Sequence, residues 1–72
     1  MMYTDGIHLI SDVSIEELHA FAASIGIKRC WYHRGRWSHY DIPKRRRENF
    51  AATYGVKLVD SRTIVTILKV LP

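Results

Sequence analysis

The sequence predicts a small α/β domain, with a three-stranded, mostly parallel sheet and two or three helices in the order β-α-β-α-β-α. The first observation behind this prediction is that short apolar runs alternate with segments whose apolar residues recur at helical spacing. Such alternation is typical of a parallel or mixed sheet with helices packed on it. The second is size, because 72 residues with 47% apolar content suit one domain with a packed core. Residues 1–72 are therefore assigned to a single small α/β domain.

The first predicted strand is the apolar run at residues 7–10, which follows a turn pair. A helix is predicted next, at residues 14–25. Ser14 and Glu17 have the spacing of a capping box, in which the hydroxyl accepts a hydrogen bond from the third free N–H and the carboxylate bonds back. Gly26 then supplies the left-handed residue with which many helices end.

The middle of the chain is predicted as a second strand at residues 27–32 and a polar loop at residues 33–38. Asp41 is placed to cap a second helix, which has Pro43 in its first turn and runs to Tyr54. Ligands of open α/β sheets bind at the carboxyl ends of strands. The loop after the second strand is therefore a predicted ligand site.

The last part of the chain is predicted as a strand at residues 56–59, after Gly55, and a final element at residues 63–71. The final element has the apolar spacing of a helix. Its β-branched residues also suit a strand, so both alternatives stay open.

Positive charge is concentrated in residues 28–47, which contain eight of the eleven Lys and Arg residues and one acid, Asp41. The balance of this stretch is +7 with His neutral, whereas the rest of the chain has three bases and six acids and sums to −3. Two Trp, two Tyr and two His lie in the same stretch. A basic patch interleaved with aromatic rings suits an anionic, nucleotide-like partner.

A phosphate-bearing ligand is the predicted partner of this stretch. Four consecutive cations, at residues 44–47, would occupy the first turns of the second helix, where positive charge is disfavoured unless an anion compensates it. The alternative is a solvated basic face whose aliphatic stems cover apolar surface. The predicted ligand-binding residues are Arg34, Arg36, Trp37, His39, Tyr40, Lys44, Arg45 and Arg47.

The tripeptide at residues 39–41 has two interpretations. In the first, His39 binds phosphate or acts as a general acid/base, and Asp41 orients it. In the second, Asp41 is the helix cap and Tyr40 belongs to the core. A metal is not predicted, although His33, His39 and Asp41, with His8, offer nitrogen and oxygen ligands. Their spacing matches no zinc signature, and the neighbouring cations oppose a metal ion.

Several segments resemble a known family. They are D-G-I-H-L at residues 5–9, E-E-L-H-A-F-A at 16–22, I-G at 25–26, W-Y at 31–32 and H-Y-D at 39–41, followed by an Arg-rich segment that ends at Gly55. Across roughly residues 4–62 the chain resembles the domain of unknown function 4031 family of short bacterial and phage proteins. The resemblance implies a small cytosolic α/β domain, often phage-encoded, and transfers no established chemistry. Larger members begin with a longer segment, whose contribution we expect to be absent here.

The composition also indicates where in the cell the protein is located and whether it has a membrane partner. The single cysteine, Cys30, allows no internal disulfide and fits a reducing compartment. No apolar stretch approaches the roughly 18 residues of a membrane span. We therefore expect a cytoplasmic protein without a membrane partner, in the host cytoplasm if it is phage-encoded. Self-association is compatible with so small a core, which supplies only ~3–5 kcal/mol.

The leading functional hypothesis is a binding module for a phosphate-bearing ligand, either a nucleotide or a nucleic acid. By analogy with phage proteins, it would sequester a host nucleotide or counter a host nucleotide-dependent process. One alternative is a small enzyme acting on a nucleotide or phosphate ester, with His39 as acid/base and Asp41 orienting it. Another is an inhibitor that docks an acidic host protein through its basic face. No cofactor is predicted.

Overall fold

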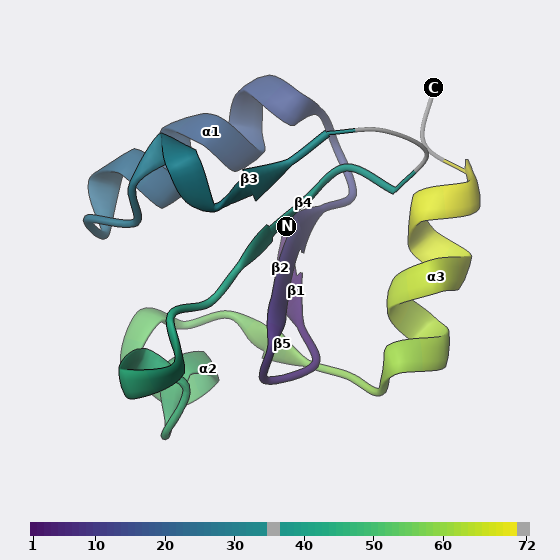
Figure 1. Cartoon of the computed structure of the whole chain (residues 1–72). Helices are drawn as coiled ribbons and strands as arrows, with labels where there is room; N and C mark the ends of the chain where they lie inside the picture. Colours follow the sequence, from purple (N-terminus) through teal and green to yellow (C-terminus); the bar gives the residue numbers. More distant parts are fainter. Residues whose placement is uncertain (35–36, 71–72) are drawn as a thin grey trace.

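The computed structural model describes residues 1–34 and 37–70, which form a five-stranded mixed sheet with helices on both sides (Figure 1). The strand order is β3-β4-β2-β1-β5. The strands are β1 (Met2–Thr4), β2 (His8–Ser11), β3 (Tyr32–His33), β4 (His39–Asp41) and β5 (Lys57–Leu58). The pairs β1/β2, β2/β4 and β3/β4 are antiparallel, and β1 pairs with β5 in parallel. The predicted three-stranded, mostly parallel sheet is therefore wrong.

A hairpin joins β1 to β2. Asp5 Oδ1 accepts hydrogen bonds from the backbone N–H groups of Ile7 and His8, at 2.9 and 2.7 Å. Gly6 has a φ of +98°, which favours glycine. A short turn of this kind joins antiparallel strands, whereas parallel strands need a long crossover. The predicted turn pair at residues 5–6 is present, but the three-residue strand before it was missed.

Helix α1 (Ile15–Ser24) confirms the first predicted helix. Ser14 is its N-cap, and the Ser14 hydroxyl accepts a hydrogen bond from the Glu17 N–H at 3.0 Å. The predicted return bond of the capping box is replaced: the Ser14 N–H donates to the Ser11 hydroxyl, and the Glu17 carboxylate accepts from that hydroxyl, which ties the start of the helix to the end of β2. Gly26 follows the helix with a φ of +78°, as its predicted role requires.

The predicted strand at residues 27–32 is wrong, because half of it is a 3₁₀ helix, η1 (Arg29–Trp31). Its last residue, Tyr32, is the one that belongs to a strand, at the start of β3. Ile27 is buried, but the next four residues are all exposed. The period-two burial of a strand is therefore lost after one residue.

The predicted second helix, capped by Asp41 and running to Tyr54, is also corrected. Asp41 is the last residue of β4 and caps no helix. The chain then forms a 3₁₀ helix, η2 (Lys44–Arg46), and a separate short helix, α2 (Phe50–Tyr54). Asn49 lies between them with a φ of 55°, in the left-handed region that interrupts a right-handed helix.

The C-terminal element is a helix, α3 (Ser61–Val70), which resolves the alternative that the sequence left open. The Thr63 N–H donates to Asp60 Oδ1 at 2.8 Å, so Asp60 caps the helix. The predicted third strand is present as β5, shortened to two residues. Leu71, the predicted last residue of the final element, lies outside the described residues.

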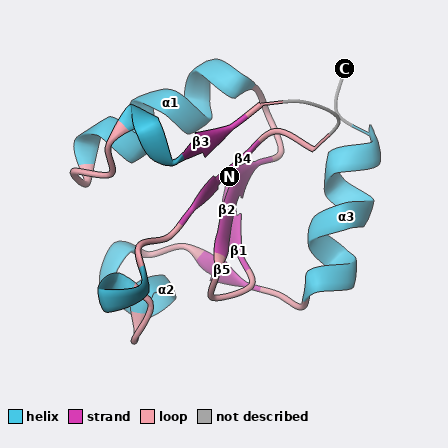
Figure 2. Cartoon of the chain, viewed as in Figure 1, coloured by secondary structure: helices cyan, strands magenta, loops and turns pink. Residues whose placement is uncertain are grey.

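The sheet separates two faces of different character. Figure 1 shows α1 and α2 on one side of the sheet and α3 on the other, and Figure 2 shows the same arrangement by element type. Leu9 and Tyr40 belong to the main hydrophobic core, together with Leu18 and Phe50 of the helices on the first side. Successive residues of a strand point to opposite faces. The neighbours of Leu9 and Tyr40 along their strands therefore face the α3 side.

Within the described part of the chain, no helix combines the length and the apolar content needed to cross a membrane.

Replacing Ser14 with alanine should destabilise the fold, because the first turn of α1 loses the acceptor for its Glu17 N–H. Loss of such a cap costs about 0.5–2 kcal/mol in the free energy of unfolding. Urea denaturation followed by circular dichroism measures this change. Thr66→Ala is the matched control, because its exposed hydroxyl bonds only within α3. Equal unfolding midpoints for wild type and Ser14→Ala would contradict the cap.

Gly26→Ala should also lower stability, by about 1–2 kcal/mol, because a Cβ disfavours the left-handed backbone. The cost is conformational rather than steric, since the nearest atom to the added Cβ would be Arg46 Nη1, at 4.0 Å. Gly26→Asn should cost less, because asparagine tolerates this region. Denaturation that ranks the asparagine variant below the alanine variant would refute the conformational explanation.

Candidate functional site

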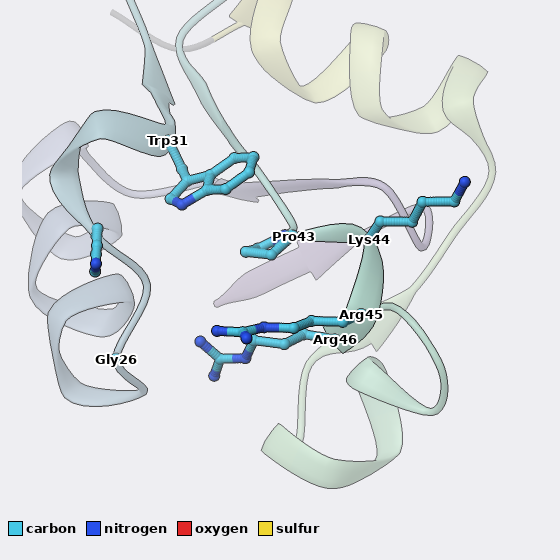
Figure 3. Close-up of a pocket in the computed structure, with 7 residues that line it drawn as sticks. Gly26, Trp31, Pro43, Lys44, Arg45 and Arg46 are labelled. Carbon is cyan, nitrogen blue, oxygen red and sulfur yellow. The ribbon is translucent and has the colours of Figure 1, made fainter.

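A pocket of about 390 Å³ lies between the end of α1, the 3₁₀ helix η1 and the start of η2 (Figure 3). We call it the basic pocket. Its lining residues are Gly26, Lys28, Trp31, Pro43, Lys44, Arg45 and Arg46. Four of these seven are cations, one is an indole, and none of the described lining residues is an acid. The pocket therefore joins the two features that the sequence analysis found in residues 28–47.

Arg46 forms a fixed wall of the basic pocket. Its Nη2 donates to the carbonyl oxygen of Ile25 and to the Tyr54 hydroxyl, at 2.5 and 2.8 Å. Its guanidinium carbon lies 5.5 Å from the centre of the Tyr54 ring. These contacts join the end of α1 to η2 and α2. Arg46 thus has a structural role as well as a charge that faces the pocket.

The other lining cations are less constrained. Lys28, Lys44 and Arg45 are exposed. In Figure 3, Arg45 and Arg46 extend side by side from η2 toward the segment that contains Gly26, with Trp31 and Pro43 above them. Trp31 has 38% of its surface exposed, so part of its ring is available to a ligand.

Of the predicted ligand-binding residues that the structure describes, two, Lys44 and Arg45, line the basic pocket. Arg47 instead donates from Nε to the Ile42 carbonyl oxygen at 2.9 Å. Arg34 is exposed, and Trp37 is half-buried. Arg36 lies outside the described residues.

The predicted set left out five lining residues, of which three have a cationic or aromatic side chain: Lys28, Trp31 and Arg46. The segment around Trp31 was predicted as a strand, in which alternation leaves one of two neighbouring aromatic residues for the core. The 3₁₀ turn at residues 29–31 instead leaves the indole at the surface. The local charge was the only sequence signal for Lys28 and Arg46.

Tyr40, another predicted ligand-binding residue, lies in the core and is 2% exposed. Its hydroxyl is 2.6 Å from His19 Nδ1, and its ring packs against those of His19 and Tyr32. Burial raises the pKa of Tyr40. Burial also lowers the pKa of His19, and the nearby Arg29 charge lowers it further. His19 is thus a structural residue that favours its neutral form.

A second group of polar side chains lies on the opposite face of the sheet. We call His8, His33, His39 and Asp41 the histidine cluster. Cross-strand pairing assembles it, because His8 pairs with Asp41 across β2/β4 and His33 pairs with His39 across β3/β4. His39 and Asp41 are two residues apart on β4 and therefore share a face. This face is opposite to the one where Leu9 and Tyr40 enter the core.

Asp41 lies at the centre of the histidine cluster. Its Oδ2 is 2.8 Å from His33 Nε2, and its Oδ1 is 3.2 Å from His39 Nε2 and 4.0 Å from His8 Nε2. The rings of His33 and His39 stack with centres 5.3 Å apart, and His8 meets His39 edge-on at 5.0 Å. The predicted contact between His39 and Asp41 is therefore present, together with two further histidines.

Contacts outside the cluster hold two of its rings. His8 Nδ1 is 2.9 Å from Asp5 Oδ2, and His39 Nδ1 is 2.7 Å from the Trp37 carbonyl oxygen. Asp5 also accepts from the Ser61 hydroxyl at the start of α3. Burial raises the pKa of Asp5, but hydrogen bonds from the His8 ring and from the backbone outweigh it and hold that pKa at about 2. Asp5 is thus an ionised anchor for His8.

The fold and these two groups define a small mixed α/β domain that has a basic pocket beside one sheet face and a histidine cluster on the other. The chain belongs to the family described as "Protein of unknown function (DUF4031)", whose model matches residues 4–71. The resemblance found in the sequence is confirmed. No curated protein and no solved structure shows significant similarity to the chain.

Stability should depend on pH through His19. Because its pKa is lowered in the folded state, the unfolded chain binds the proton more readily, and the wild type loses stability as pH falls through about 6.5. His19→Gln removes this titration. The unfolding free energy of the wild type, minus that of the variant, should therefore decrease from about pH 7.5 to about pH 5.5. Denaturation at several pH values measures the difference, and a difference that is constant or grows at low pH would contradict the assignment.

Proposed function

We propose that the protein binds a phosphate-bearing ligand, a nucleotide or a nucleic acid, in the basic pocket. The observation that carries this proposal is the lining of the pocket, to which four cations and one indole contribute. The volume of about 390 Å³ falls in the range of roughly 300–1,000 Å³ that is typical of small-molecule sites. Basic side chains beside an exposed aromatic ring suit a phosphate joined to a base.

The lining residues suggest a division of roles. Lys28, Lys44 and Arg45 are exposed and can reach phosphate oxygens. The Arg fork pairs with two phosphate oxygens at once, whereas Lys acts as a point charge. Trp31 offers a face on which a base can stack. Arg46 adds charge while its hydrogen bonds keep the pocket wall in place.

The basic pocket does not include His39, which the sequence analysis expected to bind phosphate or to act as a general acid/base. Both ring nitrogens of His39 have partners within the protein, at Trp37 and Asp41. A phosphate bound by His39, or proton transfer from its ring to a ligand, would require one of these contacts to break. For this reason the binding module is favoured over the enzyme that uses His39 as acid/base.

We also propose a biological setting for this binding activity. A phage origin, a cytoplasmic location and a role in sequestering a host nucleotide rest on the family resemblance and on composition. Self-association and docking to an acidic host protein likewise stay predictions. Binding of a phosphate-bearing ligand is the chemistry that the nucleotide-dependent roles share, and it can be measured directly.

Binding should weaken steeply with salt, because cations in the pocket release counterions when they contact phosphates. We expect a short single-stranded DNA to bind with a linear log–log salt dependence, and Lys28→Ala or Arg45→Ala to make the slope shallower by about 0.7 each. Fluorescence anisotropy of a labelled oligonucleotide measures this, and competition with ATP separates the two ligand sources. If ATP displaces the oligonucleotide, a mononucleotide is sufficient for the site; if it does not, the site needs a strand.

Arg62→Ala is the matched control, because Arg62 is an exposed cation on α3 and does not line the pocket. The Arg62→Ala variant should bind the oligonucleotide with the affinity and the salt slope of the wild type. Trp31→Ala should cost about 1–3 kcal/mol of binding free energy if a base stacks on the indole. No binding of either ligand at low salt, or equal losses in the Arg62 and Arg45 variants, would overturn the proposal.

A further inference from the structure

Three of the four histidines of the chain point their Nε2 atoms at one carboxylate, that of Asp41. The fourth, His19, lies in α1 and bonds to Tyr40. Three separate strands supply the cluster, so its assembly depends on the sheet register and on no local motif. Within the described part of the chain, the ion-pair partners of Asp41 are all histidines.

The outer contacts of the cluster decide which ring nitrogens carry protons. A backbone carbonyl only accepts hydrogen bonds, so His39 Nδ1 must donate to the Trp37 oxygen. An ionised carboxylate also only accepts, so His8 Nδ1 donates to Asp5. In each neutral ring, Nε2 is therefore the nitrogen with the lone pair. Both of these lone pairs lie near Asp41 Oδ1, at 3.2 and 4.0 Å.

When both rings are neutral, three electron-pair donors converge in this way, and a metal cation between them would satisfy all three. The arrangement also matches the usual surroundings of metal-binding histidines, in which the nitrogen away from the metal donates to a carboxylate or a backbone carbonyl. His8 has the first kind of partner and His39 has the second. Groups outside the cluster thus hold the Nδ1 side of both rings and leave Nε2 toward Asp41.

We propose that His8, His39 and Asp41 bind one divalent first-row transition-metal ion through the two Nε2 atoms and the carboxylate. One donor atom from each of these residues lies within 4.8 Å of the other two. In a tetrahedral site with bonds of about 2.0–2.1 Å, neighbouring ligand atoms lie roughly 3.3–3.4 Å apart. The His39–Asp41 separation of 3.2 Å matches this directly. The His8–Asp41 separation of 4.0 Å is wider, so a bound ion would have to draw the partly exposed His8 side chain toward Asp41.

His33 is a positioning residue in this site. Its Nε2 lies 2.8 Å from Asp41 Oδ2, and its ring stacks on that of His39. This close contact with Oδ2 holds the carboxylate so that Oδ1 faces the other two histidines. His33 is also the most exposed member, with 55% of its side chain accessible.

The donor set narrows the class of metal. Two imidazole nitrogens and one carboxylate oxygen suit Zn²⁺, Fe²⁺, Co²⁺ or Ni²⁺ rather than Ca²⁺ or Mg²⁺, which prefer oxygen ligands. Three protein ligands leave at least one coordination position for water or another molecule. Partial exposure of His8, His39 and Asp41, at 38%, 21% and 31% of their side chains, lets an ion and a further ligand enter.

Co²⁺ is the probe for the first experiment, because its visible absorption reports coordination by protein ligands. Full-length chain, treated with a chelator and kept in a phosphate-free buffer, is titrated with Co²⁺ and then with Zn²⁺. We expect one ion per chain and displacement of Co²⁺ by Zn²⁺. His8→Gln, His39→Gln and Asp41→Asn should each weaken binding by more than about 100-fold, because changes outside the ligands alone cost about 10–100-fold.

His19→Gln is the matched control, since it removes the one histidine outside the cluster, and it should bind Co²⁺ like the wild type. His33→Gln should weaken binding less than His39→Gln does. Absence of Co²⁺ and Zn²⁺ binding by the wild type would overturn the proposal. Equal affinity in the wild type and in His39→Gln would do the same. No phosphate ligand takes part in these measurements, so their outcome is independent of the basic pocket.

A second measurement needs no variant, in case the substituted chains fail to fold. The histidine ring signals of the wild type are followed by NMR as Zn²⁺ is added. We expect the signals of His8 and His39 to shift or broaden with a stoichiometry of one, while those of His19 stay in place. Unchanged His8 and His39 signals, or equal changes in all four histidines, would refute the site.

Discussion

The register of β4 against β2 is the constraint on which both sheet faces depend. His8 pairs with Asp41 and Leu9 pairs with Tyr40, so each pair sends its side chains to one face. Leu9 and Tyr40 enter the hydrophobic core, while His8 and Asp41 meet on the other side. A shift of one residue would exchange the faces, because side chains alternate along a strand. Burial of Leu9 and Tyr40 therefore also sets the positions of His8 and Asp41, so core packing keeps the histidine cluster assembled.

Of the four consecutive cations at residues 44–47, two make hydrogen bonds within the protein and two are exposed. Arg46 and Arg47 donate to the carbonyl oxygens of Ile25 and Ile42, and so connect the segment to the end of α1 and to the chain after β4. Lys44 and Arg45 stay exposed beside the pocket. Four consecutive cations thus avoid the helix N-terminus that the sequence suggested, because the segment forms a 3₁₀ turn instead. Two of the four, Arg46 and Arg47, thus bind backbone carbonyl groups, and the other two remain available to a ligand.

Local signals in the sequence were sufficient for α1, because Ser14, Gly26 and the spacing of Leu18 and Ala22 all act within one helix. The concentration of positive charge in residues 28–47 could likewise be read from the sequence alone. The sheet could not be predicted in the same way, because its strands are two to four residues long and too short to show a period. The break at Asn49 depends on one left-handed residue that is not glycine. His8 and Asp41 are 33 positions apart, and only their pairing across β2/β4 makes them neighbours.

The two outer strands of the sheet, β3 and β5, contain only two residues each. An exposed sheet edge offers free N–H and C=O groups to the strands of other molecules, and long, flat edges therefore invite aggregation. Here an incoming strand would find little backbone to pair with at either edge. It would also meet the charged side chain of Lys57 at one edge and Arg34, directly after β3, at the other. The same brevity that hid these strands from sequence patterns thus protects the folded chain from edge-to-edge assembly.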